Sequence, residues 1–178
     1  MFLGKYIKSR CINGCLIFND NSNFLYWENK NVTKDEIDIT SFLNSKFKKN
    51  KISLLHVGVG NSYIALNLKN FNKIDGISIS GNEINNANRL KIKNYNTVFV
   101  NKFDKDVFIS KNYTKYDVIV DVNLKSFCCC EKSFNKLMQD YSIMLNKGGF
   151  IATGIDGMNW SRFVKPVIRF SFKRFFYK

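Results

Sequence analysis

From residue 52 onward, hydrophobic residues fall into short runs that alternate with longer amphipathic stretches. The strand-like runs cover residues 52–57, 74–79, 96–100, 116–121 and 149–154. The helix-like stretches include NEINNANRLKIKN and EKSFNKLMQDYSIMLNK. Strands that alternate with helices form right-handed crossovers, so the pattern predicts an α/β fold with a mostly parallel sheet covered on both faces. Ligands of such sheets bind beyond the carboxyl ends of the strands.

The first fifty residues have a different pattern. Two short β-prone runs, 15–18 and 23–27, flank a stretch of Asn, Asp and Ser, which predicts a hairpin. Thr33 and Glu36 then have the spacing of a capping box, and apolar residues recur at helical intervals after them, which predicts a helix over 34–48.

Composition indicates a folded and strongly basic protein. The 178 residues suffice for one domain, and 45% of them are hydrophobic. The formal charge of +14 favours polyanions such as RNA, or an anionic membrane surface. A second interpretation is that this charge reflects a drift in amino-acid composition and has no function, because the basic residues are mostly Lys and are scattered among many Asn, Ile and Phe. Only the C-terminal end concentrates basic residues beside aromatic ones, a mixture suited to stacking on RNA or resting on a membrane.

The five cysteines indicate a reducing compartment. Three of them, Cys128 to Cys130, are contiguous, and no spacing resembles a zinc or disulfide framework. A contiguous triplet cannot direct three thiolates at one ion without distortion, so we expect packing residues and no metal. Neither a secretory leader nor a membrane-spanning run is recognisable, and a cytoplasmic location is expected.

The segment LLHVGVGNS joins the first predicted strand to a helix through Gly58 and Gly60. Such a turn exposes backbone N–H groups to a ligand in the crevice. A dinucleotide site would need a small residue at the third glycine position and an acid about twenty residues on. This chain has Tyr63 and Ser78 at those places, which argues against a dinucleotide.

Five segments, in order, resemble class I S-adenosylmethionine-dependent methyltransferases, nearest to the cyclopropane-fatty-acid-synthase-like and related small-molecule enzymes. They are LLHVGVGNS, DGISISGNEINNANRL, VFVNKFD, YDVIVDVNL and LNKGGFIATG. The resemblance covers about residues 52–155. It implies a three-layer Rossmann-like sheet in the order 3-2-1-4-5, with S-adenosylmethionine as cofactor.

The resemblance also implies which residues hold that cofactor. The methionine half would contact Gly58, Gly60, Asn61 and Ser62; the ribose would face Ser78, Ile79 and Ser80; the adenine would lie by Asn101, Lys102 and Phe103; and the methyl group would lie near Asp121, Val122 and Asn123. Two positions depart from the family. His56 replaces the acid of the first motif, and Ser78 replaces the ribose-binding acid, for which Glu83 is a candidate substitute from the next helix.

The acceptor of the methyl group is left open by the sequence. No D/N-P-P-Y/F segment is present, nor a Pro-Cys pair, since the sole proline is Pro166. Asp121, Asn123 and Asp156 are catalytic candidates, and the segment DGMNW offers Asp156, Asn159 or Trp160 for acceptor contact. A plain turn is the alternative for that segment.

Few residues follow the fifth predicted strand, whereas the family's sheet continues with two more strands. Val167 to Phe172 alternates as one strand would. We therefore expect an N-terminal hairpin and helix (1–50) and a methyltransferase-like unit with a short C-terminal part (51–178). Three hypotheses follow: a methyltransferase for a small molecule, a non-catalytic interaction module of the same fold, and an RNA-modifying or RNA-binding protein.

Overall fold

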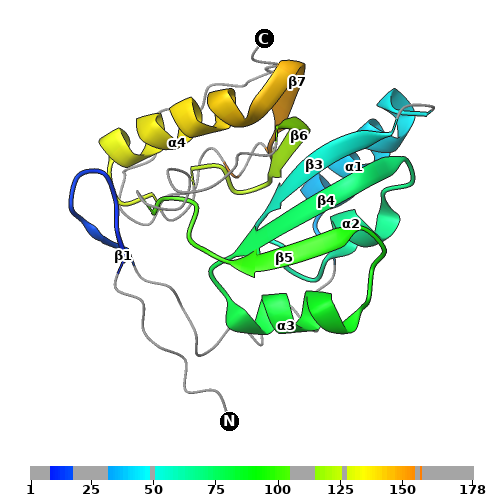
Figure 1. Cartoon of the computed structure of the whole chain (residues 1–178), viewed down its shortest axis with the longest axis horizontal. Coiled ribbons are helices and arrows are strands. Elements are labelled where there is room, and N and C mark those ends of the chain that lie inside the picture. The colour runs from blue at the N-terminus through cyan, green and yellow to red at the C-terminus, as the bar shows by residue number, and fades with distance from the viewer. Residues whose placement is uncertain are drawn as a thin grey trace.

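Five parallel strands form the central sheet of the computed structural model, which describes residues 9–17, 32–48, 51–104, 115–125, 128–154 and 157. In the order of the sheet, the strands are β5 (Tyr95–Phe99), β4 (Phe71–Ser78), β3 (Ile52–Val57), β6 (Tyr116–Asp121) and β7 (Leu145–Ala152) (Figure 1). Counted from the first strand of this sheet, the order is 3-2-1-4-5. The predicted order and the α/β, Rossmann-like class are thus confirmed.

Two strands have the predicted boundaries, and the other three begin one to four residues before their predicted runs. Both 52–57 and 116–121 are strands as predicted. The last strand begins at Leu145 instead of 149, because Gly148 takes a φ of +82° inside the strand and the register with β6 shifts there. The two glycines of the segment LNKGGFIATG therefore lie at an irregularity within β7.

Four helices accompany the sheet among the described residues: α1 (Lys34–Lys46), α2 (Tyr63–Asn67), α3 (Gly81–Arg89) and α4 (Glu131–Met144). The predicted capping box begins α1: Thr33 Oγ1 accepts from Glu36 N at 3.2 Å, and Glu36 Oε2 accepts from Thr33 N at 2.9 Å. The helix after the glycine turn, α2, has only five residues.

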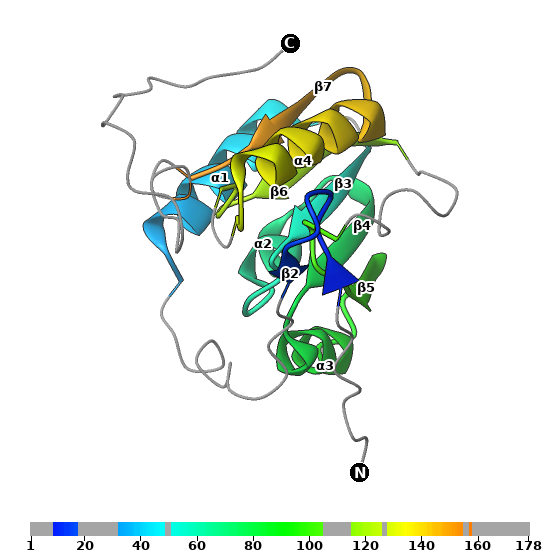
Figure 2. The same ribbon diagram turned by 90° about the vertical axis from the view of Figure 1, so that its left-hand side faces the viewer.

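Hydrophobic side chains cover both faces of the sheet. Because side chains alternate along a strand, Leu55 and Val57 of β3 pack toward α4, whereas Ile52 and Leu54 pack toward α1 and α2. Figure 2 shows α4 on one side of the sheet and α1 and α2 on the other. These two apolar layers fix the sheet between the helices, so that the strand ends are held in place.

The structure shows an N-terminal hairpin that was not predicted from the sequence. Strand β2 (Leu16–Ile17) lies within the predicted run 15–18 but pairs with β1 (Ser9–Arg10), while 23–27 lies outside the described residues. Gly14, at a φ of +78°, makes the turn. The dipeptide Asn-Gly is a strong hairpin signal, and its presence before the first predicted run could have identified this pairing.

The hairpin lies beside the start of α4, at the side of the sheet toward which the arrowheads of β4 and β5 point (Figure 1). Cys11 of its turn is buried in the same apolar cluster as Cys128 and Leu137. Among the described residues, no helix has the length and apolar character needed to cross a membrane. The predicted strand from Val167 to Phe172 lies outside those residues.

Candidate functional site

The glycine turn at the carboxyl end of β3 is built on left-handed backbone. Gly58 has a φ of +73°, Gly60 of +49° and Ser62 of +64°. Gly58 N donates to Ile77 O on β4 at 2.8 Å, which ties the turn to the neighbouring strand. A side chain at Gly58 would be strained by that φ, yet its Cβ would meet no atom of the described residues within 4 Å. The turn therefore borders open space at the strand ends.

A carboxylate meets this turn from the next crossover. Glu83 Oε2 accepts from Gly60 N at 3.1 Å and from Ser78 Oγ at 2.6 Å. Ser80 caps α3 by accepting from Glu83 N, and its own N–H donates to Ser78 Oγ at 3.0 Å. Burial raises the pKa of the Glu83 carboxyl, and the hydrogen bonds from Ser78 and Gly60 oppose that rise. A carboxylate from the first turn of α3 thus lies beside Ser78.

His56, by contrast, points into the interior. Its side chain is 1% exposed and its Nδ1 lies 3.2 Å from Tyr95 Oη. Burial lowers its pKa to about 4, so the imidazole is neutral at pH 7. The Tyr95 ring reaches it from β5 across Gly76 of β4, where a Cβ would lie 2.7 Å from the ring. His56 is a buried strand residue, and its contact with Tyr95 could not be predicted from the sequence.

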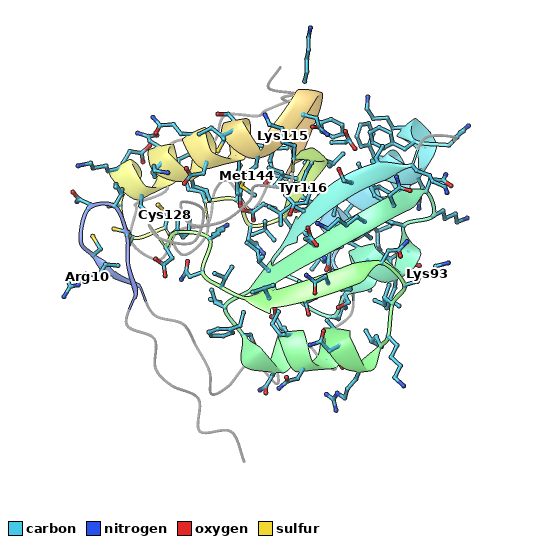
Figure 3. The ribbon with its side chains drawn as sticks, in the orientation of Figure 1. Arg10, Lys93, Lys115, Tyr116, Cys128 and Met144 are labelled. Atoms are coloured by element: carbon cyan, nitrogen blue, oxygen red, sulfur yellow. The ribbon has the colours of Figure 1, made fainter. Side chains whose placement is uncertain are left out.

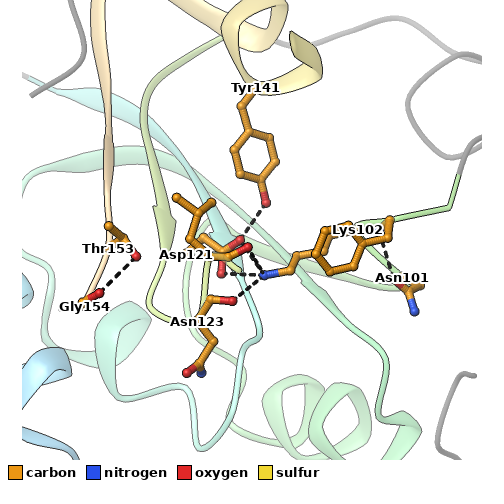
Figure 4. Close-up of polar contacts among 9 residues, drawn as sticks. Asn101, Lys102, Asp121, Asn123, Tyr141, Thr153 and Gly154 are labelled. Atoms are coloured by element: carbon orange, nitrogen blue, oxygen red, sulfur yellow. Dashed lines mark hydrogen bonds and ion pairs between the residues drawn. The ribbon is translucent and has the colours of Figure 1, made fainter. Parts of the chain in front are cut away.

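A buried ion pair occupies the end of β6 (Figure 4). Lys102 Nζ donates to Asp121 Oδ1 at 3.0 Å and Oδ2 at 2.8 Å, and to the carbonyls of Asn123 and Leu124. Tyr141 Oη of α4 donates to Asp121 Oδ2 at 2.9 Å. Burial lowers the pKa of Lys102, and the Asp121 charge opposes this. Both carboxylate oxygens of Asp121 are therefore engaged, and the sequence did not reveal this pairing.

Several of the remaining predicted residues make hydrogen bonds with the backbone near these two clusters. Asn61 Oδ1 accepts from Tyr63 N at 3.0 Å, and Asn101 Oδ1 accepts from Phe103 N at 2.9 Å. Val122 O accepts from Gly154 N at 3.3 Å. Ile79 is half-buried after β4. The acceptor candidates Asp156, Asn159 and Trp160 lie outside the described residues, as does the basic C-terminal tail.

The strand ends thus carry two groups of predicted residues. The first joins Gly60 to Ser78 and Glu83, and the second joins Lys102 to Asp121. Glu83 offers a hydrogen-bond acceptor beside a glycine turn, which suits a ligand with hydroxyl groups. Lys102 carries a buried positive charge whose partners are already in place.

Comparison with known proteins identifies the fold. No family model and no curated protein matches the sequence. The amino pentose methyltransferase CalS10 from Micromonospora echinaspora, bound to SAM, matches with a TM-score of 0.53 at 14% identity over 74% of this chain. The N-methyltransferase NodS from Bradyrhizobium japonicum WM9 matches with 0.53 at 12% identity over 66%.

The plantazolicin methyltransferase BamL, in complex with a triazolic desmethylPZN analogue and SAH, matches with a TM-score of 0.52 at 23% identity over 72% of this chain. These likenesses define the class of fold: this is the Rossmann-like fold of class I methyltransferases. The chain spans 56%, 66% and 48% of the lengths of CalS10, NodS and BamL.

Proposed function

We propose that this protein binds S-adenosylmethionine beyond the carboxyl ends of β3 and β4 and transfers its methyl group to a small-molecule acceptor. CalS10, bound to SAM, and BamL, bound to SAH, share its fold, and both are methyltransferases. The observation that carries the proposal is the meeting of the Glu83 carboxylate with Gly60 of the turn and Ser78 of β4. This arrangement supplies an acid at the strand ends despite the serine at position 78.

The residues of the turn fit such a ligand. The open space at Gly58 admits a ligand close to the backbone, and Glu83 can accept hydrogen bonds from ribose hydroxyls. The cofactor, when bound, supplies a methyl group already activated on a sulfonium. The protein's task is then to hold the acceptor close and aligned. Because Lys102 and Tyr141 engage the oxygens of Asp121, that carboxylate is a positioning group in our proposal and not a general base.

A second candidate function is a non-catalytic binding module of the same fold. One observation favours it: the ammonium of Lys102 is fixed at the end of β6, where the resemblance expects the positively charged sulfonium. Two like charges in a buried site repel each other. A module of this kind would bind S-adenosylhomocysteine, whose sulfur carries no charge, more tightly than S-adenosylmethionine and would show no turnover.

The test is calorimetric titration of the protein and a matched pair of glycine variants with both ligands. Gly58→Ala and Gly148→Ala each place a Cβ on a left-handed residue with nothing within 4 Å, so each costs about 1 kcal/mol of stability. Only Gly58→Ala fills space beside the proposed cofactor, and only this variant should lose binding. Absence of heat with either ligand at millimolar concentration in the unmodified protein refutes both candidate functions.

Binding without methyl transfer to any of a panel of amines, hydroxyls and carboxylates would favour the module. RNA binding through the basic C-terminal residues stays a prediction, checked by whether affinity for single-stranded RNA falls steeply with added salt.

A further inference from the structure

Four of the five cysteines meet at one place in the fold, one of them buried and three partly buried. Cys11 and Cys15 flank the turn between β1 and β2, and Cys129 and Cys130 directly precede α4. Their four Sγ atoms all lie within 4.8 Å of one another. Two segments that are far apart along the chain thus contribute a pair of thiols each. All five cysteines are free thiols.

The spacing of these sulfur atoms is close to that of a tetrahedral zinc site. With Zn–S bonds of about 2.3 Å, sulfur atoms at the corners of a tetrahedron lie about 3.8 Å apart. Sγ of Cys129 and Sγ of Cys130 are separated by 4.0 Å. The sulfur–sulfur distances, all within 4.8 Å, would have to shorten by about one ångström at most to reach this value, a change of the size that small side-chain rotations can make.

The hairpin turn prepares its two cysteines for such a role. Cys11 N donates to Cys15 O at 3.1 Å and Gly14 N donates to Cys11 O at 2.9 Å, which closes the turn and fixes both side chains relative to each other. Asn13 N donates to Cys11 Sγ at 3.3 Å. A backbone N–H directed at sulfur stabilises the thiolate, the form that binds metal.

Within the contiguous triplet, Cys128 differs from Cys129 and Cys130. Cys128 is fully buried, and its thiol donates to Cys130 O at 2.9 Å, so its sulfur lies outside the cluster. Figure 3 shows Cys128 in the loop that precedes α4 and Arg10 on the hairpin. Only Cys129 and Cys130 complete the set, so the distortion expected for three adjacent ligands does not arise. The sequence spacing pointed away from a metal because it could not show that the hairpin lies against this loop.

We propose that Cys11, Cys15, Cys129 and Cys130 bind one Zn²⁺ as four thiolates. Binding releases the four thiol protons and leaves a centre with a net charge of −2, which a chain of formal charge +14 tolerates. The Arg10 guanidinium donates to Gly14 O at 2.8 Å and places one positive charge on the turn. Since all four ligands come from the protein, the site is closed and structural. It fastens the N-terminal hairpin to the start of α4.

The experiment measures zinc directly in protein purified under reducing conditions and passed through gel filtration. We expect one zinc ion per chain by elemental analysis, and a melting temperature that falls on treatment with a chelator and recovers with added zinc. Cobalt substitution should give the charge-transfer and d–d absorption of tetrahedral thiolate coordination. Zinc-free protein that gains neither zinc nor thermal stability when one equivalent is added would overturn the proposal, as would an intact mass showing disulfides under these conditions.

Variants test which sulfur atoms are ligands. Cys15→Ser and Cys129→Ser should each reduce bound zinc to a small fraction of an ion per chain. Cys128→Ser is the matched control, because it changes a neighbouring thiol whose donor role toward Cys130 O a hydroxyl can keep. It should retain one zinc ion. Loss of zinc from Cys128→Ser equal to that from Cys129→Ser would contradict the assignment.

Discussion

Replacing Glu83 with glutamine should weaken cofactor binding without weakening the fold. Gly60 N–H and Ser78 O–H both donate to Oε2, so the amide oxygen of the variant must take that place to keep these two hydrogen bonds. The amide NH₂ then stands where the second carboxylate oxygen was. A ribose hydroxyl that donates to a carboxylate in the native protein meets a donor in Glu83→Gln.

The size of the effect follows from the kind of hydrogen bond that is lost. Hydrogen bonds to a charged group contribute about 1.5–3 kcal/mol, against about 1 kcal/mol for neutral ones, and the variant also leaves a mismatched donor. A loss of about 2 kcal/mol corresponds to a Kd for S-adenosylmethionine that is about 30-fold higher. Acidification should weaken native binding in the same way, beginning at a higher pH than for an ordinary glutamate, because burial raises the pKa of this carboxyl.

Stability should change in the opposite sense. Because the pKa of Glu83 is raised above its ordinary value of 4.5 in the folded chain, its contribution to stability is greatest below pH 4.5 and is lost as the pH rises through the folded pKa. The amide copies the protonated form, so thermal melting at pH 7 should show Glu83→Gln to be at least as stable as the native protein.

The matched control is Glu131→Gln, which removes the same charge from the first turn of α4, where the side chain is 62% exposed. Calorimetry should find its Kd unchanged. If the native protein binds and Glu83→Gln binds equally well, then Glu83 does not contact the cofactor and the reasoning fails.

Two further predictions concern buried titratable side chains. Burial lowers the pKa of His56 from 6.5 to about 4, so on acidification the unfolded chain binds a proton before the folded chain does. Between pH 6.5 and 4, this difference should lower the free energy of unfolding by about 3 kcal/mol. Urea titrations of His56→Asn across this pH range should lack that part of the decrease. Lys102→Met should lower the free energy of unfolding by about 3 kcal/mol, because it leaves Asp121 charged in the interior.

A separate result would contradict each of the predictions for His56 and Lys102. An equal pH dependence in His56→Asn and the native protein would mean that the imidazole is not kept neutral by burial. Lys34→Met serves as the control for Lys102→Met, since it breaks an exposed ion pair with Asp38, and its urea midpoint should not move. Equal midpoints for the two lysine variants would contradict a buried role for Lys102.

The parts of this structure that local patterns determine could be predicted from the sequence. The strand at 52–57, the glycine turn after it and the capping box of Thr33 and Glu36 all depend on residues a few positions apart. The proximity of Glu83 to Ser78 was also within reach, because one helical turn separates the helix start from the strand end. The strand order, by contrast, was an expectation that came from the family resemblance of five segments, and the sheet has that order.

Contacts between distant segments could not be predicted in this way. Lys102 follows β5 and Asp121 ends β6, and nothing in either segment indicates that the ammonium of Lys102 turns toward that carboxylate. Tyr95 reads as an ordinary strand residue until Gly76 is known to leave room for its ring. Likewise, the two cysteine pairs can be recognised as one cluster only once the hairpin is known to lie beside the start of α4. Each of these contacts depends on how distant segments pack in three dimensions, which the periodicity of the chain does not indicate.

The Tyr95 ring crosses over Gly76 to reach His56, so the residues at these three positions, on three adjacent strands, can be substituted only together. A side chain at Gly76 would displace the ring, and loss of the ring would leave His56 Nδ1 without its hydroxyl partner in an interior closed to water. Among homologues, these three alignment columns should therefore covary, with glycine at 76 wherever histidine and tyrosine occur together. That covariation would give a sequence marker for chains in which the first-motif acid has been exchanged for a buried imidazole.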